Sequence, residues 1–192
     1  MESLELEKSL NFERKGSLDE VSKEIFELHD FGENDVLLVD NDETLTPTWE
    51  NFLLKKPFDS LRQDTKDFLN KSKENKVPTA IVTNMPRENH YMNHTTPVFG
   101  YEHFFENNFL KKIEFPLTLF LGSLYKQTDK SLYEIAMWSL NNGSNEGKIA
   151  WVGNSYLDQG FGFRLEKILR KLDYKGDFYM YRLPMIRSFK KS

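Results

Sequence analysis

The chain contains no cysteine, and this absence excludes several classes of protein at once. It excludes a disulfide scaffold, cysteine-ligated zinc sites, iron–sulfur clusters and a cysteine nucleophile. Long apolar runs are also missing: no stretch approaches the roughly 18 consecutive apolar residues that span a bilayer. The N-terminal segment MESLELEKSLNFERKG is acidic and interrupted by charges, unlike a secretory signal peptide. We therefore expect no integral membrane segment and a cytoplasmic location.

The sequence does have enough apolar residues for one globular domain. Of its 192 residues, 39% are hydrophobic and 29% are charged. A chain of this length buries about 70% of the surface that it exposes when unfolded, which supports a core without disulfides or a structural metal. Because there is no internal repeat and no low-complexity linker, we expect one domain over residues 1–192. Residues 1–16 are expected to be a flexible lead-in segment.

Charge is divided unevenly between the two ends, although the net charge is only −4. Glu and Asp dominate the N-terminal part, whereas Lys and Arg accumulate from residue 164 and end in a basic tail over residues 186–192. Such a basic end could meet nucleic acid or an anionic lipid surface. A solvated helix face followed by a short basic tail explains the same residues, so both interpretations stay open.

Hydrophobic periodicity predicts helices and strands in alternation, which is typical of a parallel sheet covered on both faces. The first helix is expected over residues 17–29, with Ser17 as N-cap and Glu20 completing a capping box. The other expected elements are strands over residues 35–40, 78–83, 116–121, 149–152 and 178–181, helices over residues 57–74, 130–140 and 163–172, short helices within residues 85–112, and a tight loop at Gly160 and Gly162. The predicted fold is a single three-layer, Rossmann-like α/β domain with a central parallel sheet.

Polar residues end the predicted strands, where an open parallel sheet binds its ligands. The first strand ends in D-N-D-E-T, and the alternation of an extended backbone brings Asp40 and Asp42 to one side. Two neighbouring carboxylates do not both ionise comfortably, so either a cation neutralises them or one carries a proton. The other strand ends supply Thr83, Asn84, Lys126, Lys130, Asn154 and Asp158. Both states of the acidic pair suit phosphoryl transfer.

In order and spacing, these residues resemble the four motifs of the haloacid dehalogenase (HAD) superfamily of phosphohydrolases. The resemblance runs from about residue 36 to residue 162. It comprises D-N-D-E-T after the first strand, V-T-N after the second, a lysine, and V-G-N-x-x-x-D after the fourth. It implies a HAD-like fold and a phosphatase activity. The acid at position 42 favours a phosphatase over a dehalogenase, which needs no acid there.

The resemblance also implies a role for each motif residue. Asp40 would be the nucleophile that forms an aspartyl-phosphate, and Asp42 would act as acid and base. Thr83 and the backbone N–H of Asn84 would bind the phosphoryl oxygens, and Thr44 would belong to the same phosphate-binding group.

The motif lysine would neutralise charge on the nucleophile and the phosphate. Two residues lie near the usual distance, Lys126 and Lys130. Lys126 is preferred because it stands just ahead of the segment Tyr133-Glu134-Ile135-Ala136, which looks like the family's following helix. Lys130 remains the alternative.

By the same resemblance, a magnesium ion would be bound by Asp40, the backbone carbonyl of Asp42, Asn154 and Asp158, an all-oxygen shell suited to that cation. The family's last motif usually begins Gly-Asp, whereas this chain has Gly153 and then Asn154. An Asn carbonyl can still ligate magnesium but carries no negative charge. Weaker metal binding is expected unless Asp158 is a direct ligand.

Family members carry cap domains in two intervals, and each holds only about forty residues here. No large cap is therefore expected, and residues 47–54 would form only a small flap. In the superfamily, capless members often act on substrates that themselves close the site, such as proteins, nucleic acids or lipid headgroups. Within this group the chain is similar to the phosphatidylglycerophosphate phosphatases in its Arg182-Leu183-Pro184 ending and basic tail, whereas Glu43 replaces an Asn of their first motif.

The predicted function is magnesium-dependent hydrolysis of a phosphorylated substrate, large or lipid in nature, through an aspartyl-phosphate. The alternative is a HAD-like protein of weak or no catalytic activity that binds a phosphorylated ligand or a protein partner, with Asn154 as the lesion. A nucleic-acid end phosphatase or binder rests on the basic C-terminus alone and would predict steep salt dependence.

Overall fold

The computed structural model describes residues 11–41, 43–45, 63–86, 98–101, 126 and 128–184, and for residues 84–86 and 98–101 it describes the backbone alone. Several sequence predictions fall outside these residues. They are Asp42, the flap over residues 47–54, the strand over residues 116–121, most of residues 85–112 and the basic tail over residues 186–192.

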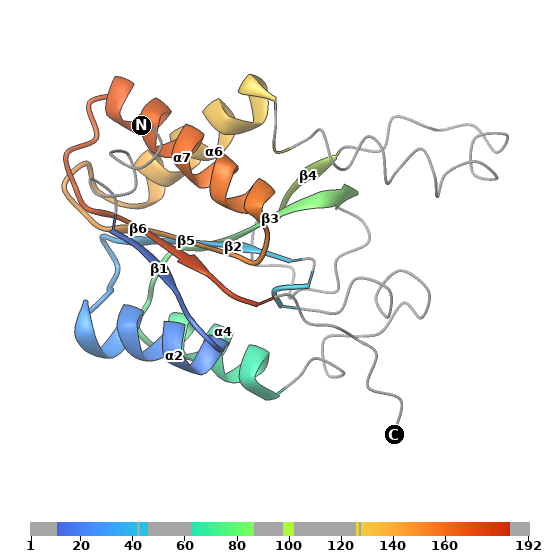
Figure 1. Ribbon diagram of the computed structural model, residues 1–192. Helices are drawn as coiled ribbons and strands as arrows, with labels where there is room; N and C mark the ends of the chain where they lie inside the picture. The colour runs from blue at the N-terminus through green and yellow to red at the C-terminus, as the bar shows by residue number, and fades with distance from the viewer. Residues whose placement is uncertain are drawn as a thin grey trace, which may run out of the picture.

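A parallel sheet of six strands forms the centre of the described fold (Figure 1). Its order is β1-β6-β5-β2-β3-β4, and every neighbouring pair is parallel. The strands are β1 (Asn11–Arg14), β2 (Val36–Asp40), β3 (Thr79–Pro86), β4 (Val98–Tyr101), β5 (Ile149–Gly153) and β6 (Phe178–Arg182). Because all strands run in one direction, their carboxyl ends share one edge of the sheet.

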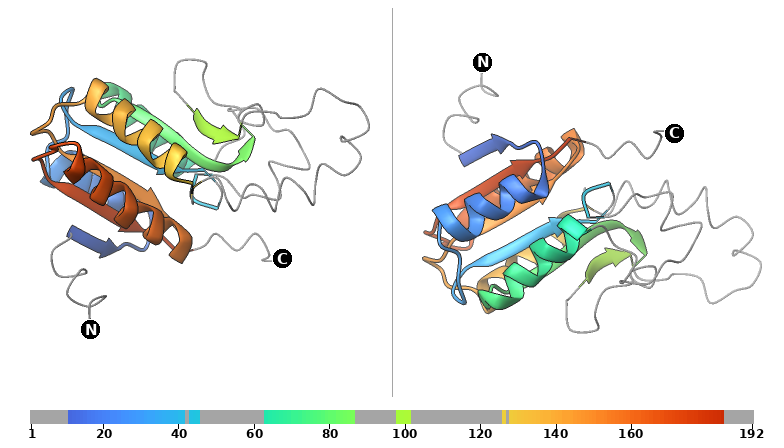
Figure 2. Two further views of the ribbon diagram at one scale, coloured as in Figure 1. Left: turned by 90° about the horizontal axis from the view of Figure 1, so that it is seen from above. Right: turned by 90° about the horizontal axis from the view of Figure 1, so that it is seen from below.

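Helices cover both faces of this sheet, as the two views of Figure 2 show. One face carries α2 (Leu18–Lys23), which continues as the π-helical turn η1 (Glu24–Leu28), and α4 (Gln63–Glu74). The other face carries α6 (Asp129–Asn142) and α7 (Tyr156–Lys171). The three layers confirm the predicted single Rossmann-like α/β domain.

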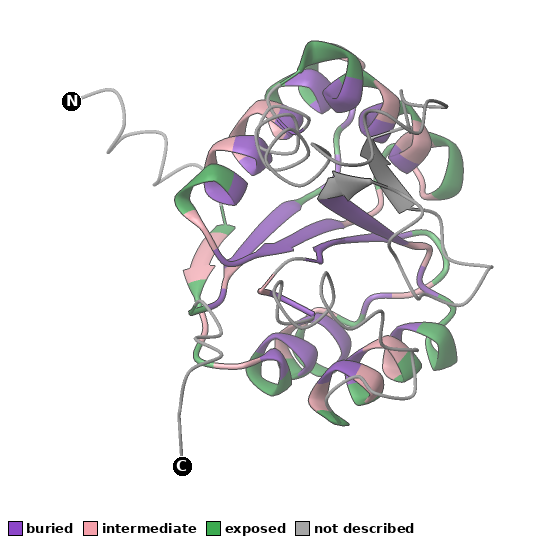
Figure 3. Ribbon diagram, turned by 90° about the vertical axis from the view of Figure 1, so that its right-hand side faces the viewer, coloured by how far each residue is buried: buried purple, intermediate pink, exposed green. Residues whose placement is uncertain are grey.

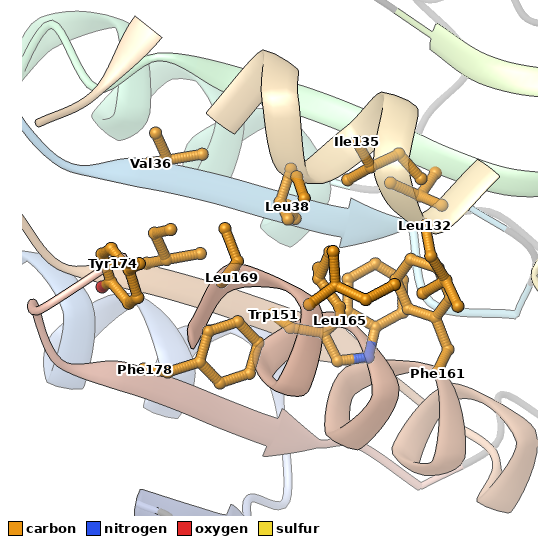
Figure 4. Close-up of a cluster of buried hydrophobic side chains, with 14 of the residues drawn as sticks. Val36, Leu38, Leu132, Ile135, Trp151, Phe161, Leu165, Leu169, Tyr174 and Phe178 are labelled. Atoms are coloured by element: carbon orange, nitrogen blue, oxygen red, sulfur yellow. The ribbon is translucent and has the colours of Figure 1, made fainter. Parts of the chain in front are cut away.

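The core lies between the layers, where the strands are buried and the helices expose only their outer faces (Figure 3). All five residues of β2 are buried, and successive side chains point to opposite faces. Val36 and Leu38 belong to the cluster under α6 and α7, shown in Figure 4. Leu37 and Val39 belong to the cluster over α2 and α4. This double burial explains why β2 is an uninterrupted apolar run.

Side chains fix the starts of the helices. Ser17 caps α2, since its hydroxyl accepts a hydrogen bond from the Glu20 backbone N–H at 3.3 Å. The Glu20 carboxylate accepts a hydrogen bond from the backbone N–H of Gly16 at 2.8 Å. The predicted capping box would instead use the backbone N–H of Ser17, the N-cap residue. Thr128 caps α6 in the same way through the backbone N–H of Ser131 at 3.2 Å.

Three predictions about the elements are wrong. Residues 11–14 form the edge strand β1, although they were expected to belong to a flexible lead-in. Residues 98–101 form the edge strand β4 within a region expected to be helical. Helix α7 begins at Tyr156 and runs through Gly160 and Gly162, where a loop was expected. Edge strands are short, so their local pattern is weak. Two glycines likewise weaken the helical pattern of α7. In both cases tertiary packing determines the secondary structure of the segment.

Gly162 shows how that packing operates. A Cβ at this position would lie 2.7 Å from Sδ of Met180 and 2.8 Å from Cδ1 of Trp151. The helix backbone therefore approaches the sheet as closely as it does only because residue 162 has no side chain. No helix in the described part of the chain combines the length and apolar character that a membrane span requires.

Candidate active site

A buried lysine joins two buried aspartates at the carboxyl edge of the sheet. The ammonium group of Lys126, just ahead of α6, donates to Oδ1 of Asp40 at the end of β2. It also donates to Oδ1 of Asp158 in α7 at 2.8 Å. All three residues are at most 4% exposed. Segments from distant parts of the chain thus meet through one cation held between two carboxylates.

The charge on Lys126 is stabilised by its two partners. Burial alone would lower the pKa of this lysine, but the charges of Asp158 and Asp40 and their hydrogen bonds outweigh that effect and raise it above its ordinary value. The ammonium also lies 5.3 Å from the ring centroid of Trp151, close enough for a cation–π interaction. Lys126 therefore stays a cation throughout the physiological pH range.

Four hydrogen-bond donors hold the carboxylate of Asp158. Its Oδ2 accepts hydrogen bonds from the Ser155 hydroxyl at 2.6 Å and from the backbone N–H groups of Ser155 and Asn154 at 3.0 and 3.2 Å. Burial raises the pKa of Asp158, but the charge of Lys126 and these hydrogen bonds lower it by more. The pKa of Asp158 therefore lies below its ordinary value. Asp158 is therefore an ionised carboxylate that holds Lys126 in place.

The start of α7 explains how Asp158 reaches this position. Ser155 and Asp158 form a reciprocal capping box at the N-terminus of the helix. Gly153 lies directly beneath, and a Cβ there would come within 2.5 Å of the Asp158 Cβ. The Trp151 indole N–H donates to the Asp158 backbone carbonyl at 2.8 Å. One serine, one glycine and one tryptophan thus position the aspartate that binds the lysine.

Asp40 is held from its other side by the turn that follows β2. The Thr44 hydroxyl donates to Oδ2 of Asp40 at 2.7 Å, and Thr44 is fully buried. The backbone carbonyl of Asn41 accepts from Thr44 and Leu45 at 3.3 and 3.0 Å, which closes the turn. Glu43 takes a left-handed conformation with φ of 61° to allow it. Both oxygens of the Asp40 carboxylate therefore accept a hydrogen bond from a side chain.

Three further predicted site residues, Thr83, Asn84 and Asn154, lie at the same edge of the sheet. Thr83 is fully buried and follows Val82, the register partner of Asp40 on β3. Asn84 continues β3, and only its backbone is described. Asn154 is buried immediately after Gly153. Asp42 lies outside the described residues, so its role as acid and base stays a prediction.

The structure separates the two candidate lysines. Lys130 is exposed on the first turn of α6, whereas Lys126 is buried against Asp40. The two residues that order Asp158, Ser155 and Trp151, were not singled out from the sequence. The pattern Ser155-x-x-Asp158 is that of a capping box, and it is a signal that could have found Ser155. The role of Trp151 depends on packing and leaves no local signal.

The side-chain oxygens at this edge include ligand types that magnesium prefers. Within the described ranges, no three Asp, Glu or His side chains converge as a metal site. Asp40 supplies a carboxylate at the end of β2, and Asn154 supplies an amide oxygen directly after the neighbouring strand β5. Mg²⁺ is bound through one or two carboxylates, with waters and substrate phosphate oxygens completing its shell. Asp40 and Asn154 therefore fit this cation, whereas direct ligation by Asp158 would compete with its four hydrogen-bond donors.

No protein-family model, curated protein or solved structure matches the chain significantly.

Proposed function

We propose that this protein is a magnesium-dependent phosphatase of the HAD type, which hydrolyses phosphomonoesters through an aspartyl-phosphate on Asp40. The observation that carries the proposal is the buried chain Asp40–Lys126–Asp158 at the carboxyl ends of β2 and β5. Replacing a buried ion pair by apolar residues is often neutral or stabilising, so stability alone gives little reason to bury this cation. A chemical role for Lys126 gives one. Its position is the one where open parallel sheets bind ligands.

In the first step, a carboxylate oxygen of Asp40 attacks the phosphorus and the ester P–O bond breaks. The electron pair of that bond goes to the leaving oxygen, which Asp42 protonates. Lys126 reduces the repulsion between the anionic nucleophile and the anionic phosphoryl group. Thr44 restrains the carboxylate through Oδ2, so that Asp40 keeps a fixed orientation for attack.

In the second step, water attacks the phosphorus of the aspartyl-phosphate, Asp42 takes a proton from it, and inorganic phosphate leaves. The carboxylate of Asp40 is thereby restored. Bound at Asp40 and Asn154, Mg²⁺ would supply positive charge to the phosphoryl oxygens. Thr83 and the Asn84 N–H would donate to the same oxygens. Asp158 keeps Lys126 charged and in place throughout both steps.

Phosphate release from p-nitrophenyl phosphate tests the proposal, measured with millimolar magnesium, with chelator, and in the variant Asp40→Asn. A surface variant of the same chemical change, Asp19→Asn on the exposed side of α2, controls for preparation. We expect turnover that requires both magnesium and Asp40 and that Asp19→Asn retains. Equal rates in wild type and Asp40→Asn across several pH values would contradict the phosphatase.

One observation favours a second function, a phosphate-binding protein without turnover. Asp158 already accepts from four donors, and Asn154 brings no charge, so the metal would depend on a single described carboxylate, Asp40. Such a protein would bind inorganic phosphate with the same affinity in magnesium and in chelator. A phosphatase should bind phosphate more tightly when magnesium is present.

A further inference from the structure

Two arginines lie side by side at the same edge of the sheet as Asp40. Arg14 ends β1 and Arg182 ends β6, and the two residues are direct register partners. Arg182 is in turn the register partner of Gly153 on β5. Since Val152 pairs with Val39, Gly153 and Asp40 are the next residues on their neighbouring strands. One row across four strands therefore reads Arg14, Arg182, Gly153 and Asp40.

These side chains also share one face of the sheet. On β6, Met180 packs in the cluster under α6 and α7, and alternation places Arg182 on that face. Phe12 packs against the same cluster, which places Arg14 there as well. Asp40 has the parity of Leu38 and faces the same way. Two strand spacings, about 10 Å, separate the backbones of Arg182 and Asp40. Between them stands Gly153, and the Asp158 side chain lies over it on this face.

The first residue of α7 completes the group. The guanidinium of Arg182 stacks 4.1 Å from the ring centroid of Tyr156, and it donates to Oε1 of Gln159 at 3.1 Å. Tyr156 is 73% exposed, so this arrangement opens to solvent. The hydrogen bond and charge of Arg182, followed by the charge of Arg14, lower the pKa of Tyr156. Both arginines therefore act on one exposed hydroxyl beside the Ser155 cap.

Neither arginine is neutralised by a carboxylate among the described residues. Lys15, next along the chain and on the opposite face, contrasts with them because it contacts Glu13 and Glu24 at 2.6 Å each. Two guanidinium groups on adjacent strands repel one another, and an anion between them removes that repulsion. Their planar N–H groups match the oxygens of a carboxylate or a phosphate.

We propose that Arg14, Arg182 and Tyr156 form a subsite for a second anionic group of the substrate, about two strand spacings from the phosphoryl group that Asp40 attacks. The inference rests on the proposed function for the identity of Asp40 as the phosphate-binding centre. The ligand class is a phosphomonoester whose leaving portion carries an oxyanion. A carboxylate and a phosphodiester present the same chemistry to the two arginines.

Binding of two phosphonates that the protein cannot hydrolyse tests this subsite. The probes are 8-phosphonooctanoate and octylphosphonate, which share a phosphonate head and an eight-carbon chain and differ in a terminal carboxylate. Calorimetry at low salt with magnesium would compare wild type with Arg14→Gln, Arg182→Gln and the double variant. Lys167→Gln, an equal charge change at an exposed position of α7, is the matched control. Thermal unfolding would establish that each variant is folded.

We expect the wild type to bind the carboxylated probe at least tenfold more tightly than octylphosphonate. This preference should fall below threefold in the double variant and persist in Lys167→Gln, while octylphosphonate binds all variants alike. A phosphonate carrying a terminal methyl phosphodiester in place of the carboxylate would identify the preferred oxyanion. Equal binding of the two probes by wild type, or binding of neither, would overturn the subsite, as would a preference that survives the double variant.

The same experiment separates this inference from the phosphatase itself. A protein that prefers the carboxylated probe but releases no phosphate from p-nitrophenyl phosphate would contradict the phosphatase and support the anion subsite. A protein that hydrolyses p-nitrophenyl phosphate but shows no preference between the probes would support the phosphatase and contradict the anion subsite.

Discussion

An aspartate lies at each end of β2, Asp35 before the strand and Asp40 at its last residue, and each contacts a lysine from elsewhere in the chain. The other partners of the two aspartates differ. Before the strand, Asp35 accepts from the backbone N–H groups of Gly32 at 2.9 Å and Lys148 at 2.6 Å. Lys148 itself lies 3.3 Å from Asp35, and its side chain is 27% exposed. After the strand, Asp40 is held by the side chains of Thr44 and Lys126.

This difference in partners indicates a structural role for Asp35 and supports the proposed catalytic role of Asp40. Backbone donors tie Asp35 to two loops, and Lys148 also donates to the carbonyls of His29 and Asp30, so that end of the sheet is closed by the fold itself. Side-chain donors hold Asp40 at the carboxyl edge of the sheet, where open parallel sheets bind their ligands. An acid that anchors loops should control stability, whereas an acid held by side chains at the carboxyl edge should control turnover.

Substituting each aspartate by asparagine is the most direct test of this contrast. If Asp40 is the proposed nucleophile, Asp40→Asn should lower the proposed phosphatase turnover by roughly 10⁴-fold or more. Asp35→Asn should leave turnover per folded molecule unchanged and cost about 1 to 3 kcal/mol of stability, because an amide cannot accept at both oxygen positions. Phosphate release and urea unfolding would measure the two effects. The contrast would collapse if Asp35→Asn lost activity while remaining folded.

Removing the two lysines extends the comparison to the cations. Lys126→Met leaves two buried carboxylates without their shared cation, and breaking such a buried pair costs about 3 to 5 kcal/mol. Lys148→Met removes a partly exposed cation, for which a cost of about 1 kcal/mol or less is expected. Denaturant unfolding of both variants would give the difference. Equal costs would mean that the carboxyl edge is as well solvated as the amino edge.

Glycines at the two ends give a third pair of variants. In Gly153→Ala the new Cβ would meet Asp158, so we expect a loss of about 1 to 3 kcal/mol and reduced turnover together. In Gly176→Ala the Cβ would lie 1.8 Å from the Gly147 carbonyl at the amino end, so stability should fall while turnover per folded molecule is kept.

Gly160→Ala is the control for both variants, because it lies in α7 with no atom within 4 Å of the added Cβ. It should stabilise the helix by about 0.5 to 1 kcal/mol. Full turnover in Gly153→Ala would show that the position of Asp158 is not critical.

The free energy of unfolding should depend on pH differently when the lysine at the carboxyl end of β2 is removed than when the lysine at its amino end is removed. The folded-state pKa of Asp158 lies below its ordinary value, so its ionisation stabilises the fold above about pH 4, and this stabilisation is lost as pH falls through the folded-state pKa. Unfolding free energies between pH 3 and 7 should therefore decline on the acid side in wild type and in Lys148→Met. The decline should be shallower in Lys126→Met, because the charge that lowers the Asp158 pKa is gone. An unchanged acid limb in Lys126→Met would assign it to other carboxylates.

Periodicity predicts the central strands and all four main helices, because their apolar patterns are set by burial between layers. The edge strands β1 and β4 are missed since each has only four residues and is fixed by pairing with one neighbour. The motif residues Asp40, Lys126 and Asp158 are predicted individually from their places at strand ends. Their mutual contacts depend on a helix that crosses Gly160 and Gly162, and local sequence opposes that helix.

The smallest expected effect concerns the residues that flank β2 on either side. Glu43, after the strand, has φ of 61°, a conformation that costs a side chain such as Glu about 1 kcal/mol and that Asn tolerates better. Glu43→Asn should therefore stabilise the protein by about 0.5 kcal/mol. Glu33→Asn, before the strand, removes the same charge at a residue without positive φ and should change stability less. Thermal unfolding in matched buffers resolves the pair. If both variants shift equally, the charge and not the backbone is responsible, and the turn that presents Thr44 to Asp40 carries no strain at Glu43.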